Sequence, residues 1–395
     1  MGTSRRPADR TDHAGPGPRL RTPAAVAALT AGALLLTGCT AGGGQVTPTT
    51  AGGLTASATP VAPAAAPAGD ASPVTELGLD CAGLLDAATA AAVDPSWLPR
   101  DPYARPAALP ADYAIAQEGG LACEWNDGSP TDGKNNAAPG TDDGSGTAFS
   151  GLRVEVLPHA TDDWPRFTEI YGEDTDANCY VVADDVLASC TSDQLAGETW
   201  VALSLRNFTP PEGAALEEVL DTVRDEVLAA VDSATIVDEP WELGGPLPAW
   251  TCVADGTLEQ ETLPGAEGAA VVAPGGGWSL YASAWQRAAA SFCTTGTDGG
   301  GEVFASESAL IGGAWALRQR LEFGHVPADS SVDVAGLPAD SAWRTCDADG
   351  CTTDLVLGDD WARLVVPAVA VADPEGVSER YATAYVERAT AAAAG

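Results

Sequence analysis

The sequence has very few of the basic residues that nucleic-acid-binding proteins use. Lys134 is the only lysine, and the chain carries 19 Lys and Arg against 56 Asp and Glu, for a formal net charge of −37. Such a surface repels nucleic acid and anionic lipid headgroups, so we expect neither as an electrostatic partner. Long hydrophobic runs are missing as well, because the apolar run from about Ala24 to Leu36 is too short for a permanent membrane-spanning helix.

Catalytic patterns are equally scarce. The sequence contains no H-E-x-x-H and no G-x-S-x-G, and Lys134 lacks the S-x-x-K spacing. The histidines of the folded part, His159 and His325, stand at unrelated places in the chain, which is typical of surface residues. There is no C-x-x-C, and the Asp-rich turns at 142–144 and 347–350 do not continue to the glutamate that closes an EF-hand loop. We therefore expect a non-enzymatic protein with no catalytic residues, no metal and no cofactor.

The N-terminus has the pattern of an export signal. Five arginines in the first 21 residues precede the apolar run, and small residues precede Cys39. The four residues Leu36-Thr37-Gly38-Cys39 resemble the lipobox of bacterial lipoproteins. The resemblance implies a signal peptide over 1–38, a palmitate-type lipid on Cys39 and a place on the extracytoplasmic side of the cell membrane. A cleaved signal with a chance cysteine is the alternative.

The next segment, residues 39–74, is composed mainly of Ala, Gly, Thr and Pro. Such a composition buries too little apolar surface to offset the entropy of ordering, so it predicts a disordered stalk. About 30 extended residues reach on the order of 100 Å. The stalk would hold the folded part away from the membrane.

The remaining cysteines indicate an internal duplication. They form two sets of four, with first gaps of 42 and 41 residues and second gaps of 56 and 53. A tryptophan follows the fourth cysteine by ten residues in both sets, at Trp200 and Trp361. The sequence therefore predicts a first repeat over 75–235, a linker over 236–249 and a second repeat over 250–395. The two sets are Cys81, Cys123, Cys179, Cys190 and Cys252, Cys293, Cys346, Cys351.

Even numbers of cysteines in an exported chain predict disulfide bonds. Four cysteines permit three pairings. We favour third-with-fourth, because Cys346 and Cys351 enclose only Asp347-Ala348-Asp349-Gly350, which contains a strong Asp-Gly turn signal. This choice pairs Cys81 with Cys123 and Cys252 with Cys293.

Apolar periodicity predicts the order helix, strands, helix, hairpin, strand, helix in each repeat. One short helix is expected from Cys81 to Val93, and another from Trp164 to Tyr171. Alternation at 152–156 predicts a half-buried strand. Long closing helices are expected to begin at Thr209-Pro210 and at Asp373-Pro374. The fold class is therefore α+β, with helices covering an antiparallel sheet in each repeat.

This arrangement resembles the Mog1/PsbP-like domains of actinobacterial lipoproteins. The lipobox, Asp80-Cys81 with Leu84-Leu85, and Cys123-Glu124-Trp125 carry the resemblance, together with the late hairpin and strand before the closing helix. It covers the first repeat fairly well and the second only in part, because Cys293-Thr294-Thr295 replaces Cys-x-Trp. The resemblance implies a location and a fold but no activity.

Tryptophans provide the remaining site predictions. Trp164 with Trp315, and Trp200 with Trp361, recur between the repeats and are expected to pack in cores. Trp125, at the start of a long polar loop, and Trp241 and Trp250, which flank the linker, are the candidates for ligand contact.

Three functions fit the sequence. The first is a lipid-anchored surface protein that binds an unknown protein partner or envelope component. The second is a carrier of a small apolar ligand, held in a groove within or between the repeats. The third is a carboxylate-based hydrolase, which would require two converging acids, one with a strongly raised pKa.

Overall fold

The computed structural model describes residues 72–105, 107–128, 150–172, 175, 177–182, 187–237, 262–263, 270–272, 277–296 and 303–393. The predicted signal, Cys39 and almost all of the predicted stalk lie outside these ranges, as do Trp241, Trp250 and Cys252. Among the described helices, none is long and apolar enough to cross a membrane.

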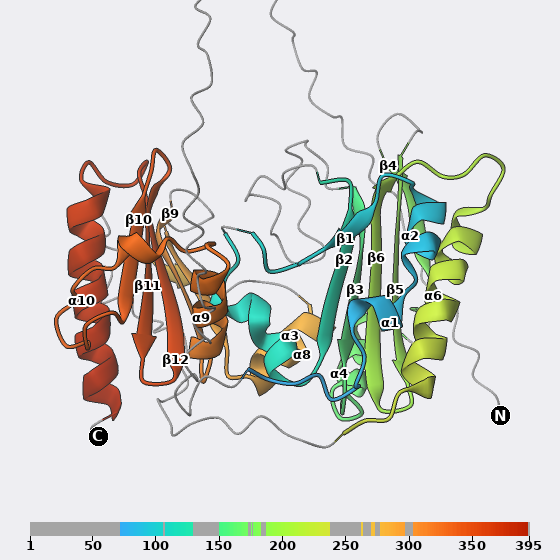
Figure 1. Ribbon diagram of the computed structural model, residues 1–395, viewed down its shortest axis with the longest axis horizontal. Coiled ribbons are helices and arrows are strands. Elements are labelled where there is room, and N and C mark those ends of the chain that lie inside the picture. Colours follow the sequence, from blue (N-terminus) through green and yellow to red (C-terminus); the bar gives the residue numbers. More distant parts are fainter. Residues whose placement is uncertain are drawn as a thin grey trace, which may run out of the picture. The chain divides into compact units, whose positions relative to one another are not determined.

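The fold is α+β, as predicted, with two antiparallel six-stranded sheets (Figure 1). The strand order is β1-β2-β3-β6-β5-β4 in the first sheet and β10-β11-β12-β9-β8-β7 in the second. Reversing the second order places β7 at the position of β1 and β10 at the position of β4. The two sheets therefore have one topology, which confirms the tandem repeats predicted from the cysteine spacing.

The first repeat contains five α-helices, one 3-10 helix and six strands within the described ranges. In chain order they are α1 (Cys81–Leu84), α2 (Ala87–Val93), β1 (Leu98–Arg100), η1 (Pro110–Tyr113), α3 (Ala114–Gln117), β2 (Leu121–Asn126), β3 (Gly151–Leu157), α4 (Trp164–Tyr171), β4 (Asn178–Val182), β5 (Leu187–Ala196), β6 (Thr199–Phe208) and α6 (Leu216–Ser233).

The second repeat follows the same plan over its described part. Its elements are β7 (Ala270–Val272), α8 (Leu280–Arg287), β8 (Ser291–Gly296), β9 (Val303–Leu310), α9 (Ala314–Glu322), η2 (Ala328–Ser330), β10 (Ala342–Cys346), β11 (Gly350–Leu357), β12 (Asp360–Pro367) and α10 (Pro374–Ala393).

Local capping explains where the predicted helices differ from the observed ones. The single helix expected from Cys81 to Val93 is two helices, because the Asp86 carboxylate accepts a hydrogen bond from Ala88 N at 2.8 Å and starts a new helix. The closing helix α6 begins at Leu216 and not near Thr209, since Gly213 has a φ of +80° that no α-helix contains. Helix α10 begins at Pro374, as predicted.

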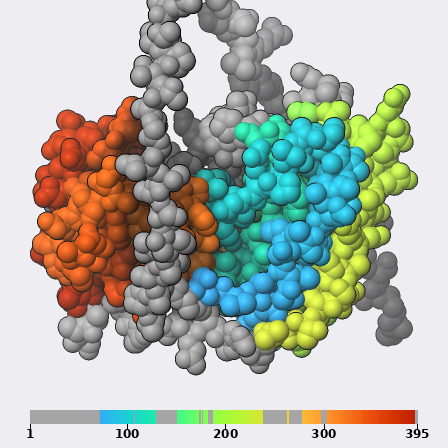
Figure 2. Space-filling model, viewed as in Figure 1, coloured from blue at the N-terminus to red at the C-terminus, as the bar shows by residue number. Residues whose placement is uncertain are grey.

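Each sheet has an outer face that a closing helix covers. In the first repeat, α6 buries an apolar stripe against the sheet, and α1 and α2 lie beside α6 (Figures 1 and 2). In the second repeat, α10 buries Tyr381 and Tyr385 against β11 and β12. The buried members of the α6 stripe are Val219, Leu220, Val223, Val227 and Val231.

The inner faces of the sheets are covered too, which the sequence did not predict. The alternation in β3 predicted a strand with one solvated face carrying Arg153 and Glu155. Glu155 is instead only 5% exposed. A helix of the second repeat, α8, contacts β3 and β6 on this face. Polar residues alternate in β3 because they meet other buried polar groups, and not because they meet water.

Three of the predicted disulfides are present: Cys81–Cys123, Cys179–Cys190 and Cys346–Cys351. Cys293 is disulfide-bonded, while Cys252, the partner predicted for it, lies outside the described residues. The Asp347–Gly350 turn also forms as expected, with Asp349 N donating to the Asp347 carboxylate at 2.8 Å.

Removing the disulfides should destabilise the fold in proportion to the chain that each one closes. The Cys81–Cys123 bond spans 42 residues and the Cys346–Cys351 bond spans five. Replacing both cysteines by alanine should lower the unfolding free energy by about 4 kcal/mol for the long loop and about 2 kcal/mol for the short one. Urea unfolding of the two double variants measures both values. A larger loss for C346A/C351A would contradict the loop-entropy explanation.

Candidate functional site

The inner faces of the two sheets enclose a third core to which both repeats contribute. Helix η1 of the first repeat contacts β9, β12 and α9 of the second, while α8 of the second contacts β3 and β6 of the first. Helices α3 and α8 also contact each other. Each repeat thus places a short helical segment on the sheet of the other, and we call the shared core between the sheets the central core.

Aromatic rings fill the middle of the central core. Tyr113 stacks on Tyr103 with 4.3 Å between ring centroids, and it packs edge-on against Trp315 and Trp361 at 5.7 and 5.5 Å. Trp200 packs edge-on against Trp164 at 5.3 Å. The tryptophans that recur between the repeats are therefore core residues, as predicted.

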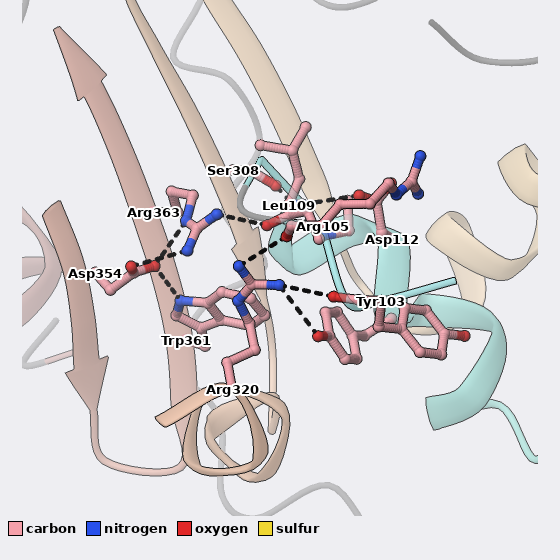
Figure 3. Close-up of polar contacts among 12 residues, drawn as sticks. Tyr103, Arg105, Leu109, Asp112, Ser308, Arg320, Asp354, Trp361 and Arg363 are labelled. Atoms are coloured by element: carbon pink, nitrogen blue, oxygen red, sulfur yellow. Dashed lines mark hydrogen bonds and ion pairs between the residues drawn. The ribbon is translucent and has the colours of Figure 1, made fainter. Parts of the chain in front are cut away.

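Two buried arginines of the second repeat, Arg320 and Arg363, hold a segment of the first repeat, and we call them the arginine clasp (Figure 3). Arg320 Nη1 donates to Tyr103 O and Nη2 to Arg105 O, both at 3.0 Å. Arg363 Nη1 donates to Ala108 O at 2.6 Å. Both side chains are at most 3% exposed. The clasp therefore fixes the chain just before η1 on the inner face of the second sheet.

The two arginines of the clasp contact different acceptors. Arg363 forms a bidentate pair with Asp354, at 2.8 Å from Nε and 2.9 Å from Nη2, and Trp361 Nε1 donates to the same carboxylate at 2.8 Å. Arg320 has backbone carbonyls as acceptors, and burial, followed by the nearby charge of Arg363, lowers its pKa. Backbone carbonyls of residues 103–108 consequently supply much of the polar contact that these guanidinium groups need.

The first sheet repeats this arrangement without the arginine. Trp200 Nε1 donates to the Asp193 carboxylate at 3.0 Å, just as Trp361 does to Asp354. The strand register places Ala202 between Asp193 and Glu155, where the second sheet has Arg363 between Asp354 and Ser308. Burial, opposed by the Trp200 hydrogen bond and reinforced by the charge of Glu155, raises the pKa of Asp193 to about 6.

Further acids surround Glu155. We give the name acid cluster to a group of four residues: Glu124, Asp112, Glu155 and Arg153. Arg153 Nη2 lies 2.6 Å from Glu155 Oε1. On the neighbouring strand β2, Glu124 lies directly opposite Arg153. Asp112 accepts hydrogen bonds from Leu109 N at 2.8 Å and from the hydroxyl of Tyr281, a residue of the second repeat. Burial opposes the charge of Arg153, but Glu155, Asp112 and Glu124 together raise its pKa.

The two acids beside Ala202 lie on different strands of the first sheet. Glu155 and Asp193 lie on β3 and β5 with β6 between them, so their Cα atoms are about 10 Å apart. Among the described residues, no group of three or more His, Cys, Asp and Glu is placed to hold a metal ion.

A second polar contact joins the repeats beside α3 and α8. Arg287 Nε lies 3.0 Å from Glu118 Oε2, and its Nη1 donates to Pro158 O at 2.8 Å. Burial raises the pKa of Glu118, and Arg287 opposes this shift. His159 is an exposed residue, as the sequence predicted, and its Nε2 lies 3.0 Å from Glu76 Oε2.

One of the three candidate ligand contacts from the sequence, Trp125, lies within the described residues. Trp125 is 1% exposed and packs in the outer core of the first repeat, so its ring has no free face for a ligand. Trp241 and Trp250 lie outside the described residues. Sequence reasoning missed Asp193 and Asp354, although the equal spacing of seven residues to Trp200 and Trp361 was a signal for them.

Comparisons with known proteins add little. No family model and no curated protein matches the chain. Among solved structures, it is similar to the di-domain ARO/CYC StfQ of the steffimycin biosynthetic pathway, at 9% identity over 62% of this chain and 75% of that one, with a TM-score of 0.12. The di-domain ARO/CYC BexL of the BE-7585A pathway has 13% identity over 62% and 77%, also with a TM-score of 0.12. A similarity at this level supports no statement about fold or activity.

Breaking the arginine clasp should loosen one segment first. We expect Arg320→Met to speed amide hydrogen exchange over residues 103–113, because Arg320 donates to two carbonyls there. The destabilisation should be about 2–4 kcal/mol, since two carbonyls lose charged donors. Arg380→Met, at an exposed position on α10, is the matched control. Uniformly faster exchange over both repeats, with no excess at 103–113, would contradict the assignment.

The two equivalent aspartates should respond in opposite directions to removal of their charge. The folded-state pKa of Asp193 lies near 6, above its ordinary value of 3.8, so the folded state binds more protons between these pH values. Its contribution to the unfolding free energy therefore falls as pH rises from about 4 to 6. Asp193→Asn should raise the unfolding free energy at pH 8 by about 2 kcal/mol and change it little at pH 4.

Asp354→Asn is the matched change in the second repeat. It leaves Arg363 buried without its carboxylate and should cost about 3 kcal/mol at pH 8. Urea unfolding at the two pH values measures both variants. Burial also raises the pKa of Asp360 to about 6. Both variants keep Asp360 and should therefore keep part of the pH dependence of the wild-type unfolding free energy. Destabilisation by both substitutions at pH 8 would refute the difference between the repeats.

Proposed function

We propose that the chain is a non-enzymatic, lipid-anchored protein of the extracytoplasmic membrane face, and that its two repeats act as one unit in binding a protein partner or envelope component. The observation that supports this most is the exchange of segments between the repeats. Helix η1 lies on the second sheet and α8 on the first, so neither inner face is complete alone.

The exchange of helical segments between the repeats would make the binding unit rigid. Association costs less free energy when the surfaces of a binding unit are already ordered. The central core and the arginine clasp order both repeats together, and the disulfides limit opening of each repeat. The sequence features at 1–74, which resemble a lipoprotein signal followed by a stalk, would place this unit outside the cell at a distance from the membrane.

The carrier hypothesis has less support in the described residues. A carrier with a groove between the repeats needs space there, and Tyr113, Trp315 and Trp361 fill the middle of that region. The hydrolase hypothesis has one favourable observation, the raised pKa of Asp193 near Glu155. Helix α8 contacts β3, which carries Glu155, and β6, which lies between the two acids, so a substrate would have to displace it.

The anchor can be tested by one substitution. Cys39→Ala should move the protein from the membrane fraction to the culture medium and abolish its incorporation of radiolabelled palmitate. Thr47→Ala, a stalk change that keeps the four-residue motif, should leave both unchanged. A Cys39→Ala protein that stays in the membrane fraction would refute lipid anchoring at this residue.

A further inference from the structure

The two equivalent edge strands, β4 and β10, differ in how their outer edges are used. Both end a sheet, and each is joined to its neighbour by a disulfide between directly opposite residues, Cys179–Cys190 and Cys346–Cys351. The Cα atoms of both pairs are 4.1 Å apart, close to the separation of a non-hydrogen-bonded antiparallel pair. The backbone groups of Cys179 and Cys346 therefore point away from the sheet, as do those of every second residue.

The second repeat shows what these outward groups do. Ala342 lies four residues before Cys346, so its carbonyl also points outward, and it accepts a hydrogen bond from Val332 N at 2.9 Å. Ser331 and Trp343 form a β-bridge on the same side. The segment beside η2 thus covers the outer edge of β10.

The outer edge of β4 is uncovered among the described residues. By the same alternation, the N–H and C=O groups of Cys179 and Val181 point outward, and no described backbone group bonds to them. The side chains of Tyr180 and Val181 are 48% and 52% exposed. A strand with open hydrogen-bonding groups and exposed apolar side chains is a template for another strand.

Charge decides which kind of strand fits this edge. The chain carries a formal net charge of −37, so a second copy would be repelled. Helix α6 contacts β4, and its exposed first turn carries Glu217 and Glu218. We propose that the outer edge of β4 binds an extended, basic segment of a partner protein as an added strand. This inference rests on the proposed binding function and names its surface.

The test uses the full chain in detergent micelles and a fluorescein-labelled peptide of four Lys-Val repeats. We expect binding at physiological salt, measured by fluorescence anisotropy. A peptide of the same sequence with every backbone nitrogen N-methylated keeps the charge but lacks the N–H donors on both strand edges, and it should bind about tenfold more weakly. A Glu-Val peptide should not bind.

Substitutions on the protein identify the edge. Val181→Pro removes an outward N–H that the β4–β5 ladder does not use, so it should weaken binding of the Lys-Val peptide about tenfold without changing the melting temperature. Val181→Thr keeps the N–H and is the control, expected to bind within about twofold of the wild type. Hydrogen exchange on the unsubstituted protein should show the Cys179 and Val181 amides protected by the peptide, which tests the edge even where Val181→Pro unfolds.

Three results would overturn the inference. They are absence of binding by the Lys-Val peptide, equal binding of the N-methylated peptide, and a concentration-dependent dimer in sedimentation that Val181→Pro abolishes. The first two would remove strand addition, and the third would make the partner a second copy. None of them bears on the membrane fraction of Cys39→Ala, so failure of the edge and failure of the anchor remain distinguishable.

Discussion

Burial of two guanidinium groups is the constraint on which the union of the repeats depends. A buried charge without partners costs several kcal/mol. Asp354 pairs with Arg363, and the carbonyls of Tyr103, Arg105 and Ala108 accept hydrogen bonds from Arg320 and Arg363. Separating the first repeat from the second sheet would remove these three carbonyl acceptors from buried guanidinium groups.

The same constraint explains why the two repeats have diverged. Both keep an Asp–Trp hydrogen bond on the inner face, but only the second has an arginine beside it. At the equivalent position the first repeat has Ala202, and burial, with the charge of Glu155 as a smaller cause, raises the pKa of Asp193. The two inner faces therefore differ in charge, because Arg363 balances Asp354 on the second sheet while Ala202 lies between Asp193 and Glu155 on the first.

The duplication could be predicted from the sequence, because the cysteine gaps and the tryptophans of β6 and β12 record it directly. Helix boundaries were less predictable, since a single carboxylate at Asp86 or a positive φ at Gly213 decides them. The candidate site could not be predicted. A strand whose polar face meets water and a strand whose polar face is buried by a distant helix have the same alternation in sequence as β3. Only tertiary contacts distinguish the two.

The two repeats also differ at the surface, in the outer edges of β4 and β10. Duplication would have given both repeats the same exposed edge, and an exposed edge promotes unwanted pairing. The second repeat removes this hazard by laying residues 331–332 along β10. The first repeat has Tyr180 and Val181 exposed at the equivalent strand. Because the Cys179–Cys190 disulfide holds β4 in register, an incoming strand would meet ordered donors and acceptors and would bear the ordering cost alone.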